Sequence, residues 1–194
     1  HPRFENSRVN RALLTAIRDQ GYITLHDLYE NYPDFNIDAE REKRLLLSHQ
    51  IIVWQYPLYM YGAPALIKQW IDLVLHHGWA HGRDGSNVAG KIVFNAVTTG
   101  GTREAYAENG FNRYSLREFF KPFEQTAYLC KMLYLPPFAV QGTYLLSRQE
   151  LERYGGLYLK TLRYLAQGAD AVQEAGRYAL LNDWIETLDS RGAL

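Results

Sequence analysis

The opening segment, HPRFENSRVN, combines side chains that bind anions with the start of a predicted helix. A helix N-terminus presents unpaired backbone N–H groups and the positive end of the helix dipole. Ser7 supplies a hydroxyl, Asn10 an amide and a neighbouring arginine (Arg3 or Arg8) a positive charge. These features predict a phosphate-binding site. In the alternative interpretation, Asn6 or Ser7 only caps the helix.

The segment at 56–64, YPLYMYGAP, is apolar and aromatic where a loop is expected to be polar and exposed. Pro57 and Pro64 stiffen its backbone, so the N–H groups between them can face a flat heterocycle. The segment therefore predicts a shelf for a planar ligand. Local packing of the aromatic side chains under a sheet is the alternative.

A third segment, TTGGT at 98–102, follows a predicted buried strand. Its two glycines allow the backbone to approach the edge of a ligand closely, and its threonine hydroxyls can donate hydrogen bonds. Nearby Tyr106 can donate its phenol proton to a developing negative charge. The alternatives are an ordinary turn and a tyrosine that only packs.

Alternating strands and helices are predicted to position these three segments. Short apolar runs predict strands at 22–25, 51–54, 92–97 and 138–140. Helical spacing and capping residues predict helices at 9–17, 39–49, 64–75, 115–133 and 151–172. Such alternation with short loops is typical of a parallel sheet covered by helices on both faces.

A further strand is expected before residue 1, because the chain opens with a loop that runs into a helix. That strand would complete a doubly wound, five-stranded α/β fold in a single domain, 1–194. Sheets of this kind bind ligands outside the carboxyl ends of their strands. The loops at 1–6, 56–62 and 98–113 are therefore expected to meet at one edge.

The composition excludes several classes of protein. Of the 194 residues, 47% are hydrophobic and 22% are charged, as in ordinary globular proteins. Basic and acidic residues number 21 each, which leaves no electrostatic basis for binding nucleic acid or an anionic membrane. The single cysteine, Cys130, excludes an internal disulfide and a cysteine-rich metal site. No signal peptide or membrane span is predicted, so a cytoplasmic protein is expected.

Two other kinds of site are disfavoured. His76, His77 and His81 have no acidic or cysteine partner in their segment, so a solvated helix end is favoured over a metal site. The motifs GxGxxG and GxxxxGK[ST] are absent, which disfavours a Rossmann dinucleotide site and a P-loop. A phosphate cradle, an aromatic shelf and a Gly-Gly edge are instead the three parts that suit flavin mononucleotide (FMN).

Three motifs in the chain resemble a known family. The segments PLYMYGAPALIKQWID at 57–72, HGWAHG at 77–82 and TTGG at 98–101 are similar to the flavodoxin-like NAD(P)H:quinone oxidoreductases. The segment YPDF at 32–35 and the stretch 112–136 are closest to the ancillary flavoproteins of bacterial glutathione-gated potassium-efflux (Kef) systems. The resemblance runs through essentially the whole chain.

The resemblance implies which residues hold the flavin, with FMN favoured and FAD as the alternative. The phosphate and ribityl chain would contact His1, Phe4, Ser7 and Asn10. The isoalloxazine ring would lie against Pro57, Leu58, Tyr59, Met60 and Tyr61. The pyrimidine edge of the ring would contact Thr98, Thr99, Gly100 and Gly101.

The resemblance also implies catalytic and substrate-side residues. Tyr106 matches the family tyrosine that stabilises the reduced flavin, and Asn112 stands where mammalian members have a histidine. Asparagine can donate a hydrogen bond but cannot carry a proton. The four positions on the substrate side are Trp79, His81, Leu129 and Cys130. Leu129 and Cys130 lie where a second subunit of a homodimer would close the pocket.

The function implied by the resemblance is ping-pong transfer of a hydride from NAD(P)H, through flavin N5, to a quinone or similar acceptor. One alternative is a regulatory subunit of a membrane potassium-efflux transporter, located peripherally at the inner membrane. Another is a flavodoxin-like electron carrier, which is ranked last because zero net charge gives no electrostatic steering.

Overall fold

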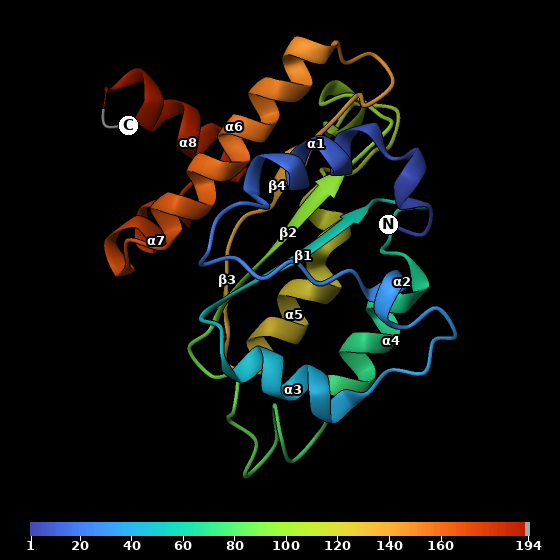
Figure 1. The fold of residues 1–194 in the computed structure, drawn as a ribbon. Helices are drawn as coiled ribbons and strands as arrows, with labels where there is room; N and C mark the ends of the chain where they lie inside the picture. The colour runs from blue at the N-terminus through green and yellow to red at the C-terminus, as the bar shows by residue number, and fades with distance from the viewer. Residues whose placement is uncertain (193–194) are drawn as a thin grey trace.

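The computed structural model describes residues 1–192, which form one parallel sheet flanked by helices (Figure 1). The sheet is built from β1 (Ile51–Pro57), β2 (Ile92–Thr98), β3 (Leu133–Tyr134) and β4 (Phe138–Val140). Strand β1 pairs with β2 along its full length, and both β3 and β4 pair with the other edge of β2. All these pairings are parallel, so the carboxyl ends of the strands share one edge of the sheet.

Strands β3 and β4 are two parts of one interrupted strand. Strand β3 pairs with the start of β2 and β4 pairs with its end. Pro136 and Pro137 lie between them and have no backbone N–H to donate. The predicted strand at 138–140 is confirmed, and its pairing begins earlier in the chain than the sequence indicated.

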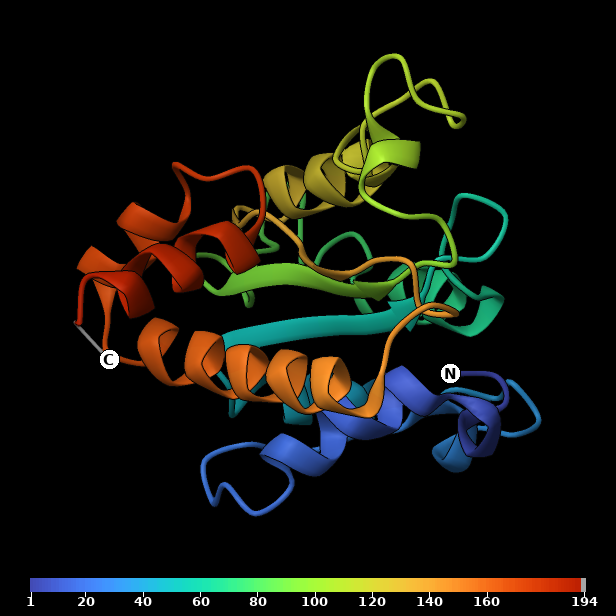
Figure 2. The ribbon, with the colours of Figure 1, turned by 90° about the horizontal axis from the view of Figure 1, so that it is seen from above.

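Helices cover both faces of the sheet (Figure 2). One face packs against α1 (Arg8–Ile17), α6 (Arg148–Leu165) and α8 (Leu181–Ser190). The other face packs against α4 (Ala65–Val74) and α5 (Lys121–Leu129), with α3 (Ala39–Leu47) beside α4. The remaining helices are short: α2 (Leu28–Asn31), α7 (Ala169–Ala175), and the 3-10 turns η1 (Phe4–Asn6), η2 (Glu104–Tyr106) and η3 (Glu118–Phe120). The predicted doubly wound α/β architecture is confirmed.

Alternation along the strands produces two hydrophobic cores. Trp54 and Val93 point into the core beneath α4 and α5. Phe94 and Phe138 point into the core beneath α1, α6 and α8, where Trp184 is also fully buried. A strand buried on both faces reads as a continuous apolar run, which is why β1 and β2 were recognisable in the sequence.

The predicted strand at 22–25 was wrong. Ile23 donates its amide to the carbonyl of Gln20 in a turn, and Tyr22 and Leu25 are exposed. A run of β-forming residues needs a neighbouring strand, and none of the strands among residues 1–192 pairs with this one. The described chain has four strands, as many as were predicted after residue 1, but β3 is one of them and the run at 22–25 is not.

Two predicted helices were too long. The helix expected at 115–133 is split into η3 and α5, and α5 ends before Lys131, whose φ of 57° is left-handed. The helix expected at 151–172 is divided into α6 and α7 at Gly168, whose φ of 124° is unfavourable for other residues. Helix α8 was not predicted. Within residues 1–192, no helix combines the length and apolar character needed to cross a membrane.

Candidate functional site

The three loops expected to carry chemistry meet beyond the carboxyl ends of the strands (Figure 2). The hydroxyl of Tyr59 lies 3.1 Å from Nε2 of His1, which joins the second loop to the first. Nδ2 of Asn10 donates to Oγ1 of Thr98 at 3.2 Å, which joins helix α1 to the third loop. The backbone of Leu58 also donates to the carbonyl of Thr98, at 2.9 Å. The fold therefore creates the cluster of loops that the sequence predicted.

The first loop is organised by the cap of α1. Oγ of Ser7 accepts hydrogen bonds from the backbone N–H of Asn10 at 3.3 Å and from its side-chain amide at 3.0 Å. Ser7 therefore does cap the helix, as the alternative interpretation held. Because an acceptor role leaves its hydroxyl proton free, Ser7 can still donate to a phosphate. Among residues 1–192, the amides of Arg8 and Val9 have no acceptor, so they also remain available to an anion.

The second loop contains a strained turn. Tyr59 and Gly62 exchange backbone hydrogen bonds of 2.9 Å in both directions. Between them, Met60 and Tyr61 both have left-handed φ values, of 46° and 65°. Such a conformation costs about 1–3 kcal/mol for each non-glycine residue. It leaves the amides of Met60 and Tyr61 without an acceptor in the described chain, so two N–H donors are available to a ligand.

The third loop needs its two glycines. A Cβ atom on Gly100 would lie 2.7 Å from the ring of Tyr144, and one on Gly101 would lie 3.0 Å from the ring of Tyr106. Within residues 1–192, neither glycine amide has an acceptor. The hydroxyl of Thr99 donates to the carbonyl of Gly101 at 2.7 Å, so this side chain helps to fix the shape of the loop.

Tyr106 belongs to an aromatic cluster centred on Phe119. Tyr106 and Tyr114 each meet the Phe119 ring edge-on at a centroid distance of 6.0 Å, and Tyr61 stacks on it at 5.1 Å. Burial raises the pKa of Tyr106, and a hydrogen bond with Thr99 opposes that shift. The phenol therefore stays protonated at neutral pH and can donate a hydrogen bond.

Asn112 lies beside this cluster. Its Oδ1 accepts a hydrogen bond of 3.3 Å from the hydroxyl of Tyr61. Its Nδ2 would be 3.5 Å from a Cβ on Gly101, so it faces the glycine edge. Asn112 thus joins the aromatic shelf to the glycine loop and offers an N–H donor there.

One residue near the site was not predicted from the sequence. Tyr144 follows β4, and its ring lies over Gly100 while 86% of the residue is exposed. Its loop is fixed by Gly142, which donates to Gly101, and by Thr143, which donates to Thr99. Its position just after the last strand was a signal that could have identified it, because that position belongs to the same edge of the sheet.

The four predicted substrate-side residues lie at the opposite edge of the sheet from the loops. Gly90, just before β2, donates to the carbonyl of Lys131, which places the end of α5 at the amino ends of the strands. A pocket of about 300 Å³ opens there, lined by Ile71, Asp72, Leu75, His76, His77, His81, Thr126, Leu129 and Cys130. Trp79 packs nearby against Lys43, whose Nζ lies 5.5 Å from the ring. Within one chain, therefore, these residues lie away from the three loops.

This second pocket has limited chemistry of its own. Within residues 1–192, no three histidine, cysteine or acidic side chains are grouped so as to hold a metal ion. Burial raises the pKa of the Cys130 thiol, which keeps it protonated and unreactive. The pocket is therefore lined by apolar side chains, by imidazole rings and by the carboxylate of Asp72.

The residues at the three loops fit FMN. The helix start suits a phosphate, and the free amides of Met60, Tyr61, Gly100 and Gly101 suit the polar edge of a flat ring. The glycines leave room for close approach by that edge.

Comparisons with known proteins agree with this geometry. A family model described as "Flavodoxin-like fold" matches residues 1–159. The ancillary protein KefG of the glutathione-regulated potassium-efflux system from Erwinia tasmaniensis is 42% identical over 81% of this chain and 86% of its own. The uncharacterised NAD(P)H oxidoreductase YdeQ of Bacillus subtilis is also 42% identical, over 82% of this chain and 81% of its own.

Solved structures give the same fold. General stress protein 14 of Treponema denticola, in complex with FMN, has a TM-score of 0.81 at 38% identity and covers 84% of this chain and 94% of its own. A structure described as a thermophilic tryptophan halogenase from Streptomycin violaceusniger has a TM-score of 0.81 at 39% identity, over 87% and 96%. An NADPH-quinone reductase from P. pentosaceus has a TM-score of 0.76 at 31% identity, over 82% and 92%. The chain therefore belongs to the flavodoxin-like family, with relatives among the KefG proteins and NAD(P)H oxidoreductases.

Proposed function

We propose that this protein is an FMN-dependent NAD(P)H:quinone oxidoreductase. The observation that carries the proposal is the strained turn at Met60 and Tyr61, which leaves two free amides and is joined to the loop of Gly100 and Gly101 by the bond from Leu58 to Thr98 and through Asn112. Strain of this kind persists where it serves a site. The FMN-bound relative from Treponema denticola and the quinone reductase from P. pentosaceus support the same activity.

Each part of the site has a defined task in this proposal. FMN, when bound, accepts a hydride from NAD(P)H and passes two electrons to a quinone. The residues that would hold its phosphate and ribityl chain are His1, Phe4, Ser7 and Asn10; those against its ring are Pro57, Leu58, Tyr59, Met60 and Tyr61; those at its pyrimidine edge are Thr98, Thr99, Gly100 and Gly101. Thr98 can offer its hydroxyl proton to the edge, because in the described chain its Oγ1 only accepts from Asn10, and Thr99 acts there by fixing the shape of the loop through its bond to Gly101.

Tyr106 and Asn112 act at the ring in this proposal. The protonated phenol of Tyr106 donates a hydrogen bond towards negative charge that develops on a bound ring, and the raised pKa keeps that proton in place. Asn112 donates a hydrogen bond through Nδ2 but carries no proton. A proton that a quinone takes up would therefore come from water and not through a tyrosine–histidine relay.

A homodimer would complete the site. Leu129 is 51% exposed and Tyr128 is 77% exposed, which is unfavourable for apolar side chains left in water. We propose that a second copy covers this end of α5 and brings its pocket, with Trp79, His81, Leu129 and Cys130, against the flavin loops. The proposed domain is then one flavin-binding unit per chain.

Steady-state kinetics test this function. One ring site shared by donor and acceptor predicts parallel double-reciprocal lines when NAD(P)H and a quinone are varied. Intersecting lines would show that both substrates bind together and would contradict the shared site.

A second function is favoured by the KefG relatives, which are ancillary proteins of a potassium-efflux system. In that case the protein would be cytoplasmic, bound peripherally at the inner membrane through a transporter, with the redox reaction secondary. Co-purification with a potassium-efflux transporter tests it. An electron-carrier role, with transfer to a protein partner but no quinone turnover, is the third and least favoured proposal.

A further inference from the structure

Helix α8 is joined to β4 by the side chain of Asn182 and by a backbone hydrogen bond of Leu181. Oδ1 of Asn182 accepts from the backbone N–H of Ala139 at 2.8 Å, and its Nδ2 donates to the carbonyl of Ala139 at 3.0 Å. The backbone of Leu181 donates to the carbonyl of Pro137 at 3.0 Å, and Trp184 is fully buried. The start of α8 is therefore as firmly placed as the sheet, although it lies outside the family-matched residues, 1–159.

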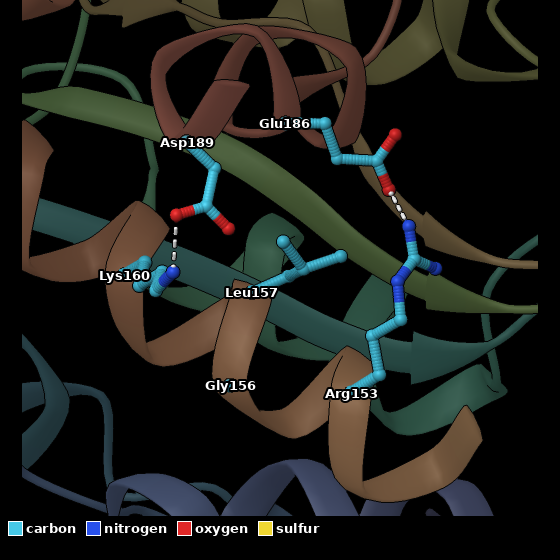
Figure 3. Close-up of a pocket in the computed structure, with 6 residues that line it drawn as sticks. All are labelled: Arg153, Gly156, Leu157, Lys160, Glu186 and Asp189. Atoms are coloured by element: carbon cyan, nitrogen blue, oxygen red, sulfur yellow. Dashed lines mark hydrogen bonds and ion pairs between the residues drawn. The ribbon is translucent and has the colours of Figure 1, made fainter. Parts of the chain in front are cut away.

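The outer face of α8 carries a row of carboxylates spaced by three residues. Glu186 pairs with Arg153 and Asp189 pairs with Lys160, across a groove of about 410 Å³ whose lining also includes Gly156 and Leu157 (Figure 3). Both of these pairs return to α6. They join one helix to another and do not touch the loops at the carboxyl edge.

Asp183, the third carboxylate in the row, reaches a different part of the molecule. Its two oxygens accept from both terminal nitrogens of Arg103, each at 2.8 Å. This forked arrangement is the geometrically most specific form of an ion pair between arginine and a carboxylate. The hydrogen bond with Asp183 raises the pKa of the Arg103 guanidinium, which stays charged at every physiological pH.

Arg103 is the residue on which the turn carrying Tyr106 is built. It immediately precedes η2, and the backbone N–H of Tyr106 donates to the carbonyl of Arg103 at 3.1 Å. In the described chain, the other backbone hydrogen bonds of the turn are local, from Ala105 to Thr102, from Ala107 to Glu104, from Gly110 to Ala107 and from Asn112 to Ala105, and the Tyr106 ring packs against Phe119. Fixing the Arg103 side chain therefore limits the movement of the whole turn.

We propose that Asp183 is a positioning residue, which acts through Arg103 to hold the turn of Tyr106 at the ring site. The inference rests on the proposed function for the role of Tyr106, but the contact itself does not. Two adjacent residues of α8 make these contacts: Asn182 is hydrogen-bonded to the sheet, and Asp183 is paired with the site loop. The Asp183–Arg103 pair thereby joins the start of the Tyr106 turn to a helix that is bonded to the sheet.

The size of the effect follows from exposure. The side chain of Arg103 is 60% exposed and that of Asp183 is 27% exposed, so solvent weakens the pair. A forked pair in this setting shifts a local equilibrium by about fivefold. We expect Asp183→Asn to slow reduction of the bound flavin by NAD(P)H in a single turnover by about fivefold.

The test compares Asp183→Asn with the matched variant Asp189→Asn. Both remove one ion pair of α8, but only Asp183 contacts the site loop, since Asp189 pairs with Lys160 of α6. Amide hydrogen exchange provides a readout that needs no flavin. Exchange at Ala105, Tyr106 and Ala107 should rise several-fold in Asp183→Asn and stay unchanged in Asp189→Asn.

A double-mutant cycle with Arg103→Gln then identifies the pair. If Asp183 acts through Arg103, the double variant should exchange and react like either single variant. Equal changes in Asp183→Asn and Asp189→Asn would overturn the inference, because they would reflect general docking of α8. Unchanged exchange in Asp183→Asn would overturn it as well. If exchange rises in Asp183→Asn but the wild-type protein reduces no quinone, the proposed function would be refuted and the positioning role of Asp183 would be supported.

Discussion

Removal of one hydroxyl group at Tyr106 separates chemistry from packing. In Tyr106→Phe the ring can keep its edge-on contact with Phe119, at a centroid distance of 6.0 Å, so folding should be little affected. What is lost is a partly buried phenol that burial keeps protonated. A preorganised donor to developing negative charge contributes about 2–4 kcal/mol, which corresponds to about 30- to 900-fold in rate.

The matched control is Tyr114→Phe. Tyr114 meets the same Phe119 ring at the same 6.0 Å, but it is half exposed and has no contact with the glycine loop. Stopped-flow absorbance should show flavin reduction by NAD(P)H slowed in Tyr106→Phe and unchanged in Tyr114→Phe. The ratio of the wild-type rate to the Tyr106→Phe rate should be constant from neutral pH to about pH 9, because the wild-type phenol titrates only above its ordinary pKa near 10. Equal single-turnover rates in wild type and Tyr106→Phe would refute the role.

Three other perturbations test the site, the core and the assembly. Gly101→Ala should weaken flavin binding at least tenfold in a fluorescence titration, since its Cβ would meet the Tyr106 ring at 3.0 Å, whereas Gly21→Ala, with open space around it, should not. The carboxylate of Glu42 is buried, which raises its pKa, but hydrogen bonds from His26, Tyr32 and Trp70 bring that pKa below its ordinary value. The contribution of this carboxylate to stability should therefore be present above about pH 4.5 and be lost as the pH falls below that value. Urea unfolding of Glu42→Gln at neutral pH should accordingly show a loss of about 1–3 kcal/mol. Leu129→Asp should convert a dimer to monomers in sedimentation velocity without loss of fold, and an unchanged sedimentation coefficient would contradict the proposed interface.

The sequence predicted best those features that depend on local chemistry. Strands β1 and β2 are buried on both faces, so their apolar runs were unambiguous. Helical spacing predicted a helix from residue 151, close to the observed start of α6 at Arg148, because residues three or four apart lie on one helix face. The Gly100–Gly101 loop was recognisable because two consecutive glycines, which lack Cβ atoms, indicate a place where the backbone can approach a ligand closely.

Features that depend on distant partners were not recoverable. Residues 22–25 have the composition of a strand, and only the absence of a pairing strand in the described chain shows that they are not one. The left-handed Lys131 ends α5 at a residue type that rarely adopts this conformation. Tyr144 and Asp183 gain their importance from contacts with Gly100 and Arg103, which are far away in the sequence.

The identity of the bound flavin tests the central claim most directly. The protein should be purified, or reconstituted by titration, and its absorbance spectrum recorded before and after denaturation. A flavin spectrum, with FMN released at one equivalent per chain, is the result that these three loops predict. A protein that remains colourless and quenches no flavin fluorescence on titration would contradict it, because the free amides and glycines would then have no ligand to serve.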